Sequence, residues 1–129
     1  MPQPRRKPPK PTPAELELLR VLWSLGPATV RDVHQVRQQE RPDATYATVL
    51  RLMQVMHGKG LLLRDESQRS HVYSAVQKAD TLRTGLLGDL IQRAFAGSGK
   101  DLVLAALKGH VSSEEREEIR RFLKESGDE

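Results

Sequence analysis

Residues 12–77 contain three helical patterns in succession, followed by two strand patterns. The first helix begins at Thr12-Pro13-Ala14-Glu15, where Thr12 caps the helix, Pro13 takes the first helical position and Glu15 reaches back as in a capping box. Gly26-Pro27 ends this helix, because proline cannot continue the hydrogen-bond ladder. The residues predicted to share its buried face are Leu16, Leu19, Leu22 and Trp23.

A second helix is predicted to begin at Thr29 and to end before Arg41-Pro42, since the residue before a proline avoids helical angles. A third helix is predicted from about Thr45 to Gly58. Its core stripe is expected to consist of Val49, Leu52, Met53 and Met56. The opposite side presents Ala47, Arg51 and Gln54, with Thr48 and Leu50 beside them.

Two short strands are predicted next, over residues 61–65 and 71–76, on either side of the polar turn 67–70. Three helices, with a tight link between the second and the third, and then a hairpin are the order of a winged helix-turn-helix. We therefore predict a mainly α fold with a small β-hairpin, in which a winged helix over residues 12–77 precedes a helical domain over residues 78–129.

The helical domain is rich in leucine on more than one face. Helices are predicted over residues 79–96 and 101–108 and from Ser112 onward. Because about 50 residues seldom bury enough surface to stand alone, we expect a second copy of the chain to cover these faces, although folding back onto the winged helix is an alternative. The candidate dimerisation residues are Leu82, Leu86, Leu87, Leu90, Ile91, Phe95, Leu102, Val103, Leu107, Ile119, Phe122 and Leu123.

The basic character of the chain is concentrated at its beginning. The net charge of +4 divides into +4 for residues 1–11, +1 for residues 12–77 and −1 for residues 78–129. The first eleven residues are also rich in proline, so we expect a disordered arm, which either touches DNA phosphates or aids solubility. Net charge alone is therefore weak support for nucleic-acid binding, and the argument depends on where the cations lie.

Several classes of protein are excluded or disfavoured. The chain has no cysteine, so disulfides, thiolate metal sites and cysteine catalysis are excluded. It has no apolar run long enough for a membrane span and no secretory signal, so we expect a cytoplasmic protein without stable membrane association. No phosphate-binding loop or metal-ligand spacing favours an enzyme, and we expect no cofactor. The histidines are scattered, at His34, His57, His71 and His110. We expect His57 and His71 to cap, pack or touch DNA and not to catalyse.

The sequence resembles the penicillinase repressor family, also called the BlaI/MecI/CopY family, over about residues 12–125. The resemblance is carried by TPAELELLRVLW (12–23) with ATVRDV (28–33), YATVL (46–50) with KGL (59–61), and HVYSAV (71–76). It implies a dimeric winged-helix repressor that binds a palindromic DNA operator. One branch of the family binds copper through cysteine pairs, and the absence of cysteine argues against that chemistry here.

The resemblance places the third helix in the major groove of DNA. Arg51 is then the candidate for a base contact instead of a solvated surface charge, and Gln54 is expected to read adenine or reach a phosphate. Ala47 permits close approach. Phosphate or thymine-methyl contacts are expected from Thr45, Tyr46 and Thr48, and backbone anchoring from Thr29, Arg31, the amides that open the second helix, and Arg69 at the wing tip. Arg64 and Lys59 are weaker candidates.

The resemblance also implies a route of release. Many members are inactivated when a membrane sensor protease causes a cut in the C-terminal helices, and the corresponding pair here is Ala105-Ala106 in place of a polar and an aromatic residue. A buried dimer helix is the alternative role of this segment. A winged helix that binds protein instead of DNA remains the alternative function for the whole chain.

Overall fold

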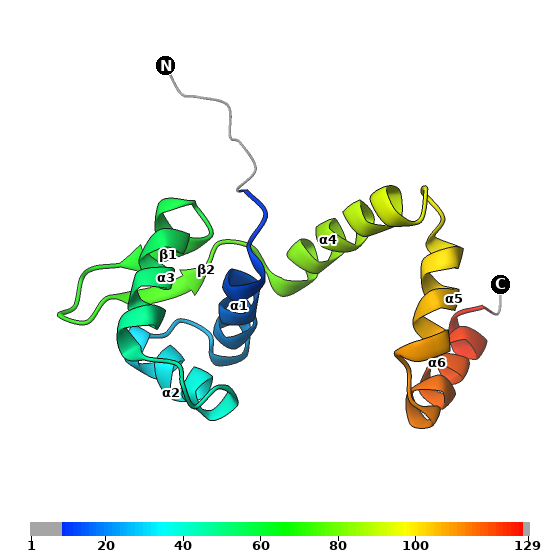
Figure 1. Ribbon diagram of the computed structural model, residues 1–129, viewed down its shortest axis with the longest axis horizontal. Helices are drawn as coiled ribbons and strands as arrows, with labels where there is room; N and C mark the ends of the chain where they lie inside the picture. The colour runs from blue at the N-terminus through cyan, green and yellow to red at the C-terminus, as the bar shows by residue number, and fades with distance from the viewer. Residues whose placement is uncertain (1–8, 128–129) are drawn as a thin grey trace, which may run out of the picture. The chain divides into compact units, whose positions relative to one another are not determined.

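The computed structural model describes residues 9–127, so most of the expected arm lies outside the described residues. Figure 1 shows the order of the elements along the chain. They are α1 (Pro13–Leu25), α2 (Val30–Glu40), α3 (Tyr46–Gly58), β1 (Leu62–Asp65), β2 (Val72–Ala75), α4 (Ala79–Ala94), α5 (Gly99–Gly109) and α6 (Ser113–Ser126). The predicted class, mainly α with a winged helix-turn-helix and C-terminal helices, is confirmed.

The chain divides into two compact units, Met1–Leu82 and Arg83–Glu129. We call residues 9–82 the head and residues 83–127 the C-terminal helices, so that α4 begins within the last residues of the head. Leu82, a predicted dimerisation residue, lies at the end of the head and packs against its core. No helix among the described residues is both long and apolar enough to cross a membrane.

The helices of the head begin where the capping residues predict. The side chains of Thr12 and Thr29 each accept a hydrogen bond from the backbone amide three residues on. The carboxylates of Glu15 and Asp32 in turn accept a hydrogen bond from the backbone amides of Thr12 and Thr29. The predicted face of α1 was partly wrong. Leu18 and Val21 are buried with Leu19 and Leu22, whereas Leu16 and Trp23 are only half-buried, because α1 packs against α2, α3 and β2 at once.

The hairpin closes one side of the head. β1 and β2 pair antiparallel with Leu62 opposite Ala75 and Asp65 opposite Val72. Ala28, just before α2, extends this sheet by pairing with Tyr73 through hydrogen bonds of 2.9 and 2.8 Å. We call this hairpin, with the turn that joins its strands, the wing (residues 62–75). The wing is thereby joined to the start of α2 through backbone hydrogen bonds.

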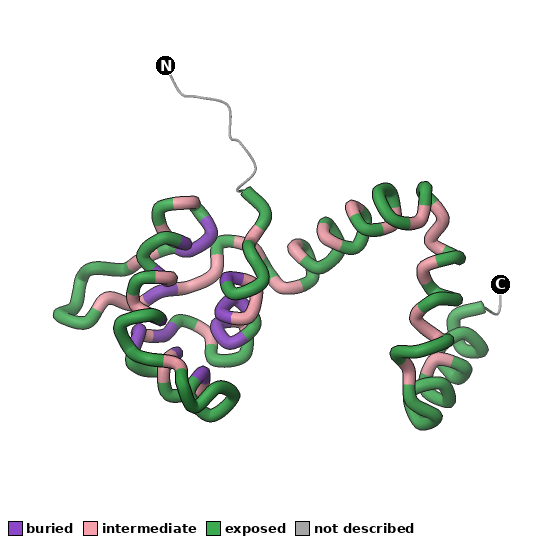
Figure 2. Tube along the Cα trace, viewed as in Figure 1, coloured by how far each residue is buried: buried purple, intermediate pink, exposed green. Residues whose placement is uncertain are grey.

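Among residues 9–127, the buried ones all lie in the head, as Figure 2 shows. The predicted α3 stripe is confirmed for Val49, Met53 and Met56, while Leu52 is half-buried at the margin. The hydrophobic core consists of Leu18, Leu19, Val21, Leu22, Ala28, Val30, Val33, Val49, Met53, Met56, Leu61, Leu62 and Tyr73.

The C-terminal helices have well-formed ends but no core of their own. α4 ends at Ala94, before Ala96 and Gly97 adopt positive φ angles of 48° and 87°. α5 begins at Gly99, two residues earlier than predicted, because Ser98 caps it. No residue of α4, α5 or α6 is buried.

Candidate nucleic-acid interface

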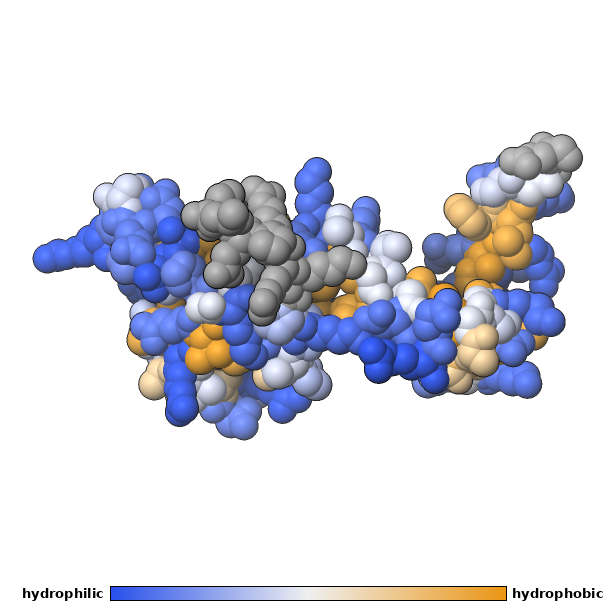
Figure 3. Space-filling view, turned by 90° about the horizontal axis from the view of Figure 1, so that it is seen from above, coloured by the Kyte–Doolittle hydropathy of each residue, from blue (hydrophilic) through white to orange (hydrophobic). Residues whose placement is uncertain are grey.

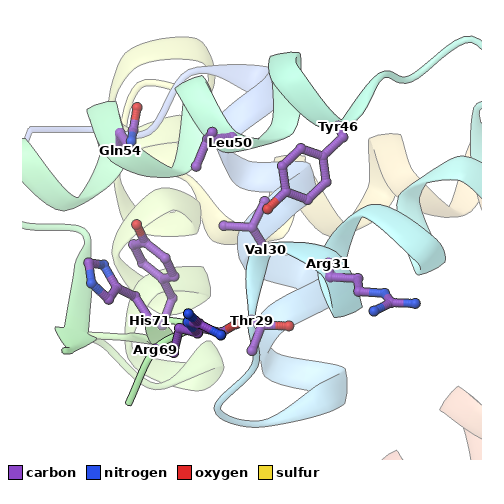
Figure 4. Close-up of a pocket in the computed structure, with 10 residues that line it drawn as sticks. Thr29, Val30, Arg31, Tyr46, Leu50, Gln54, Arg69 and His71 are labelled. Atoms are coloured by element: carbon purple, nitrogen blue, oxygen red, sulfur yellow. The ribbon is translucent and has the colours of Figure 1, made fainter. Parts of the chain in front are cut away.

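A hollow of about 240 Å³ opens on the head between α2, α3 and the wing. Figure 4 shows that the side chains around it come from the start of α2, from one side of α3 and from the wing. Its lining residues are Thr29, Val30, Arg31, Tyr46, Leu50, Gln54, Arg69, Ser70, His71 and Tyr73.

The hollow brings together five of the residues predicted to contact DNA. They come from three separate elements, and they are Thr29, Arg31, Tyr46, Gln54 and Arg69. Ala47 and Arg51 are exposed on α3 but do not line the hollow. Thr45 and Thr48 lie on a different groove, which α1 and the end of α2 also line.

Ser70 and His71 also line the hollow. Ser70 was not predicted to contact DNA, and for His71 contact with DNA was expected only as one of three roles, beside capping and packing. Both follow Arg69 in the wing, where the antiparallel register brings the beginning of β2 beside the start of α2. No local motif marks them, since their placement depends on the Ala28–Tyr73 pairing. They add a hydroxyl and an imidazole to a hollow that already has two guanidinium groups in its lining.

The amino-terminal end of α2 is partly occupied by its own cap. The Thr29 amide donates to the Asp32 carboxylate at 3.1 Å, and the Asp32 amide donates to the Thr29 hydroxyl oxygen at 3.2 Å. The capping box leaves the amides of Val30 and Arg31 as the donors that it does not use. It also places a negative charge at the end of the helix where an anion would bind.

The start of α3 is also capped. Thr45 accepts from the Thr48 amide at 3.2 Å and donates its hydroxyl hydrogen to the Thr48 hydroxyl at 2.8 Å. Arg51 is exposed, and within residues 9–127 its guanidinium forms no ion pair. The free cation on α3 therefore lies one turn beyond Thr48, on the solvent face.

Ion pairs fix α2 against α1. Arg37 is almost buried and contacts Glu17 at 3.1 Å and Glu40 at 3.3 Å, while Arg20 also contacts Glu40 at 3.2 Å. The hydrogen bond from Arg20, with the charges of both arginines, holds the pKa of Glu40 below its ordinary value. These ion pairs lie toward the carboxyl end of α2. They position the helix, and none of their side chains lines the hollow.

The two weaker candidates for phosphate contact have partners inside the head. Lys59 Nζ lies 2.7 Å from the buried Glu15 carboxylate. Hydrogen bonds to Tyr73 and Glu66 raise the pKa of Arg64, whose guanidinium lies 2.7 Å from Glu66. Arg69, by contrast, is exposed at the wing tip.

Comparisons with known proteins point in one direction. The family model of the penicillinase repressor matches residues 11–125. Two proteins named transcriptional regulator BlaI, from the CDC 1551 / Oshkosh and ATCC 25618 / H37Rv strains of Mycobacterium tuberculosis, are each 33% identical to the chain over 105 residues. The match covers 81% of this chain and 75% of each relative.

Proposed function

The chain belongs to the penicillinase repressor family and is a transcriptional repressor and not an enzyme, and from this premise we propose that it acts as a dimer on a palindromic DNA operator. The observation that carries the proposal is the hollow, where polar and basic side chains from α2, α3 and the wing converge beside the exposed face of α3. Such a surface favours the binding of phosphate groups, because guanidinium, hydroxyl and helix-end amide groups all donate hydrogen bonds to phosphate oxygens.

In this proposal α3 lies in the major groove and Arg51 reads a base edge. A guanidinium addresses guanine with two hydrogen bonds, and each such pair contributes about 1–3 kcal/mol of discrimination. Gln54 lies farther along α3 at the hollow, where it reads adenine or reaches a phosphate. Ala47 leaves room for the groove wall, and Tyr46 presents its ring and hydroxyl at the start of the helix.

Thr29, Arg31 and Arg69 anchor the DNA backbone in this proposal, and we add Ser70 and His71 to them. Because Thr45 and Thr48 use their hydroxyl groups in the α3 cap, their contribution is to set the helix start, with the Thr48 hydroxyl hydrogen still available for a phosphate. Each phosphate contact should add about one unit to the salt dependence of binding.

The C-terminal helices form the dimer interface in this proposal. They expose apolar side chains that a second copy would cover, and Figure 3 shows apolar surface gathered over α5 and α6. Two heads related by a two-fold axis would impose half-sites separated by a multiple of about 34–36 Å. The most exposed of the large apolar side chains there are Leu87, Leu90, Val103, Leu104, Phe122 and Leu123.

We propose that a signal acting on the C-terminal helices releases the operator, with proteolysis by a membrane sensor protease as one route. Ala105 and Ala106 lie inside α5, between Gly99 and Gly109, so a protease would need this helix to open before it could cut there. Incubation with a cognate sensor protease and mass measurement of the products tests this route, and an intact chain rejects it.

A gel-shift titration with the promoter of the chain's own gene tests the proposed function. The full chain should retard this DNA at concentrations that leave random DNA free. Arg51→Ala should relax the preference at one base position, whereas Arg69→Ala should weaken all sequences similarly and reduce the salt slope by about one unit. Lys78→Ala, a charge-matched control at an exposed position that does not line the hollow, should change neither quantity. No retardation here or at a neighbouring operon would favour the alternative of a protein-binding winged helix.

A further inference from the structure

His34 on α2 contacts both the turn that precedes α3 and the first residue of α3. Its Nε2 lies 3.0 Å from the carbonyl oxygen of Ala44, in the turn between α2 and α3. Its ring also meets the ring of Tyr46 edge to face, with centroids 5.8 Å apart and an interplanar angle of 86°. Neither contact was expected from the sequence, because both depend on how the turn folds back on α2.

The turn that His34 contacts is short and ends at the cap of α3. The Ala44 amide donates to the Arg41 carbonyl at 3.0 Å and so closes residues 41–44 into a β-turn. Thr45 follows at once as the α3 cap, and Tyr46 is the first helical residue. A bond to the Ala44 carbonyl therefore acts on the last peptide group before the helix begins.

We propose that His34 is a positioning residue for operator recognition, which holds the start of α3 and the Tyr46 ring in the orientation that meets DNA. The inference rests on the proposed function, since Tyr46 matters here as a lining residue of the hollow. His34 is half-buried, and its ring is engaged by the Ala44 carbonyl and by Tyr46, so in this proposal it acts through these two residues.

The chemistry of the two contacts fixes what His34 must supply. A carbonyl oxygen only accepts, so Nε2 must carry the hydrogen, and the ring is a donor both as the neutral Nε2–H tautomer and as the imidazolium. Tyr46 is 47% exposed, so the edge-to-face contact restrains a ring that solvent would otherwise leave free to change rotamer. Ordering such a side chain on binding weakens affinity by about twofold to tenfold.

These contacts also distinguish His34 from a phosphate ligand. Losing a phosphate contact lowers affinity for every DNA sequence and reduces the salt slope. Losing a positioning contact should leave the number of phosphate contacts unchanged while it loosens the geometry of base reading. The expected signature is therefore a lower operator affinity with the same salt slope and the same affinity for random DNA.

The test uses the full chain with three substitutions at this position, in which the amide of Gln replaces the donor and Phe replaces the ring. His34→Leu should lower operator affinity about tenfold, and His34→Gln and His34→Phe should each recover part of the loss. In a double-mutant cycle, His34→Leu should have less effect in a Tyr46→Leu background than in the wild type, because the two residues act together. Gln35→Leu, at an exposed neighbouring position of α2, is the control and should leave affinity unchanged.

Thermal melting of each variant separates positioning from folding. If His34→Leu does not fold, the operator affinities of the Gln and Phe variants still test the inference. The nitrogen chemical shifts of the wild-type imidazole test it as well, and an Nε2 without hydrogen would overturn it. So would additive effects in the cycle, or an equal loss for random DNA. A wild-type chain with no operator preference would instead overturn the proposed function, and this inference with it.

Discussion

The head and the C-terminal helices have similar local structure but very different burial. α5 and α6 begin at a capping side chain, as α1, α2 and α3 do, and α6 has the same capping box as α1 and α2. Yet all thirteen buried hydrophobic residues of the part that the structure describes lie in the head, whereas α4, α5 and α6 bury none. Capping and periodicity therefore define where a helix forms, whereas a hydrophobic core requires several elements that pack against one another.

The difference has a thermodynamic consequence. Isolated helices shorter than about 12–15 residues are marginal in water, and α5 has 11 residues and α6 has 14. The head gains stability from its own core, but the C-terminal helices must gain theirs from whatever covers their apolar faces. This asymmetry is compatible with the proposed function, in which the head reads DNA and the C-terminal helices control its affinity.

Removing the C-terminal helices is the change with the largest expected effect. A chain cut after Thr84 should still melt cooperatively, because the head core is complete within it. Its operator affinity should fall by roughly 10²–10⁴-fold, since the second head loses its high effective concentration. Circular dichroism melts and titrations of whole and half operators measure both quantities. A truncated head without cooperative melting would contradict the comparison, and an unchanged operator affinity would contradict the dimer.

Equal truncations in the two units should have unequal effects. Met53→Ala removes a side chain that is 0% exposed and should lower the free energy of unfolding by about 2–5 kcal/mol. Leu104→Ala removes one that is 48% exposed, and at protein concentrations below dimer formation it should change stability by less than about 0.5 kcal/mol. Urea unfolding at two protein concentrations measures this, with Val55→Ala as the exposed control on α3. A large effect of Leu104→Ala in dilute solution would show that α5 is covered within one chain.

Local features of the fold were predictable because their causes lie within a few residues. The caps at Thr12, Thr29 and Thr45 each depend on a partner three residues on, and Gly26-Pro27 acts on its own helix. The two faces of α3 follow from one period of the helix. For the same reason, the solvent face with Arg51 could be assigned from the sequence.

The contacts that were missed join residues far apart in the chain. Leu18 and Val21 are buried because α1 is covered from more than one side, which no single stripe indicates. Glu15 was predicted as a capping residue, but its second oxygen holds Lys59, 44 residues away. Ser70 and His71 reach the hollow only through sheet pairing, so the full set of lining residues required the tertiary structure.

The Glu15–Lys59 pair offers a smaller test of the head. Burial raises the pKa of Glu15, but the bonds and charge of Lys59 and the bonds of Thr12 outweigh it, so the pKa lies below its ordinary value of 4.5. A lowered pKa contributes stability above pH 4.5 that is lost as the pH falls through the folded value. Lys59→Met should cost about 1–2 kcal/mol at pH 7, less than for a fully buried pair, since Lys59 is 34% exposed.

The difference between wild type and Lys59→Met should therefore shrink as the pH is lowered below 4.5. Chemical unfolding at a series of pH values measures it. Lys78→Met, which removes an exposed lysine at the end of the head, should show no such trend. A difference that stays constant down to the acid transition would mean that Lys59 acts by packing and not by its charge.

Asp32→Asn should have the smallest effect. It should change operator affinity, whereas the equivalent substitution in the C-terminal helices should not. Asp32 and Asp101 occupy the same place in the first turn of α2 and of α5, three residues after a capping Thr29 or Ser98. Neutralising either should lower stability by about 0.3–1 kcal/mol through the helix dipole. Of these two helices, only α2 is proposed to face DNA, so Asp32→Asn alone should also raise operator affinity by about twofold to fivefold, because one negative charge near a phosphate is removed.

Melting curves and operator titrations at low salt, where screening is weakest, measure the two effects on the same samples. Asp101→Asn is the matched control, with the stability loss and no gain in affinity. Raised salt should erase the gain of Asp32→Asn, since a repulsion between a surface carboxylate and a phosphate is screened over about 10 Å at 0.1 M. If Asp32→Asn weakens operator binding at low salt, the amino-terminal end of α2 does not face the DNA backbone, and the hollow would have to meet DNA through α3 and the wing alone.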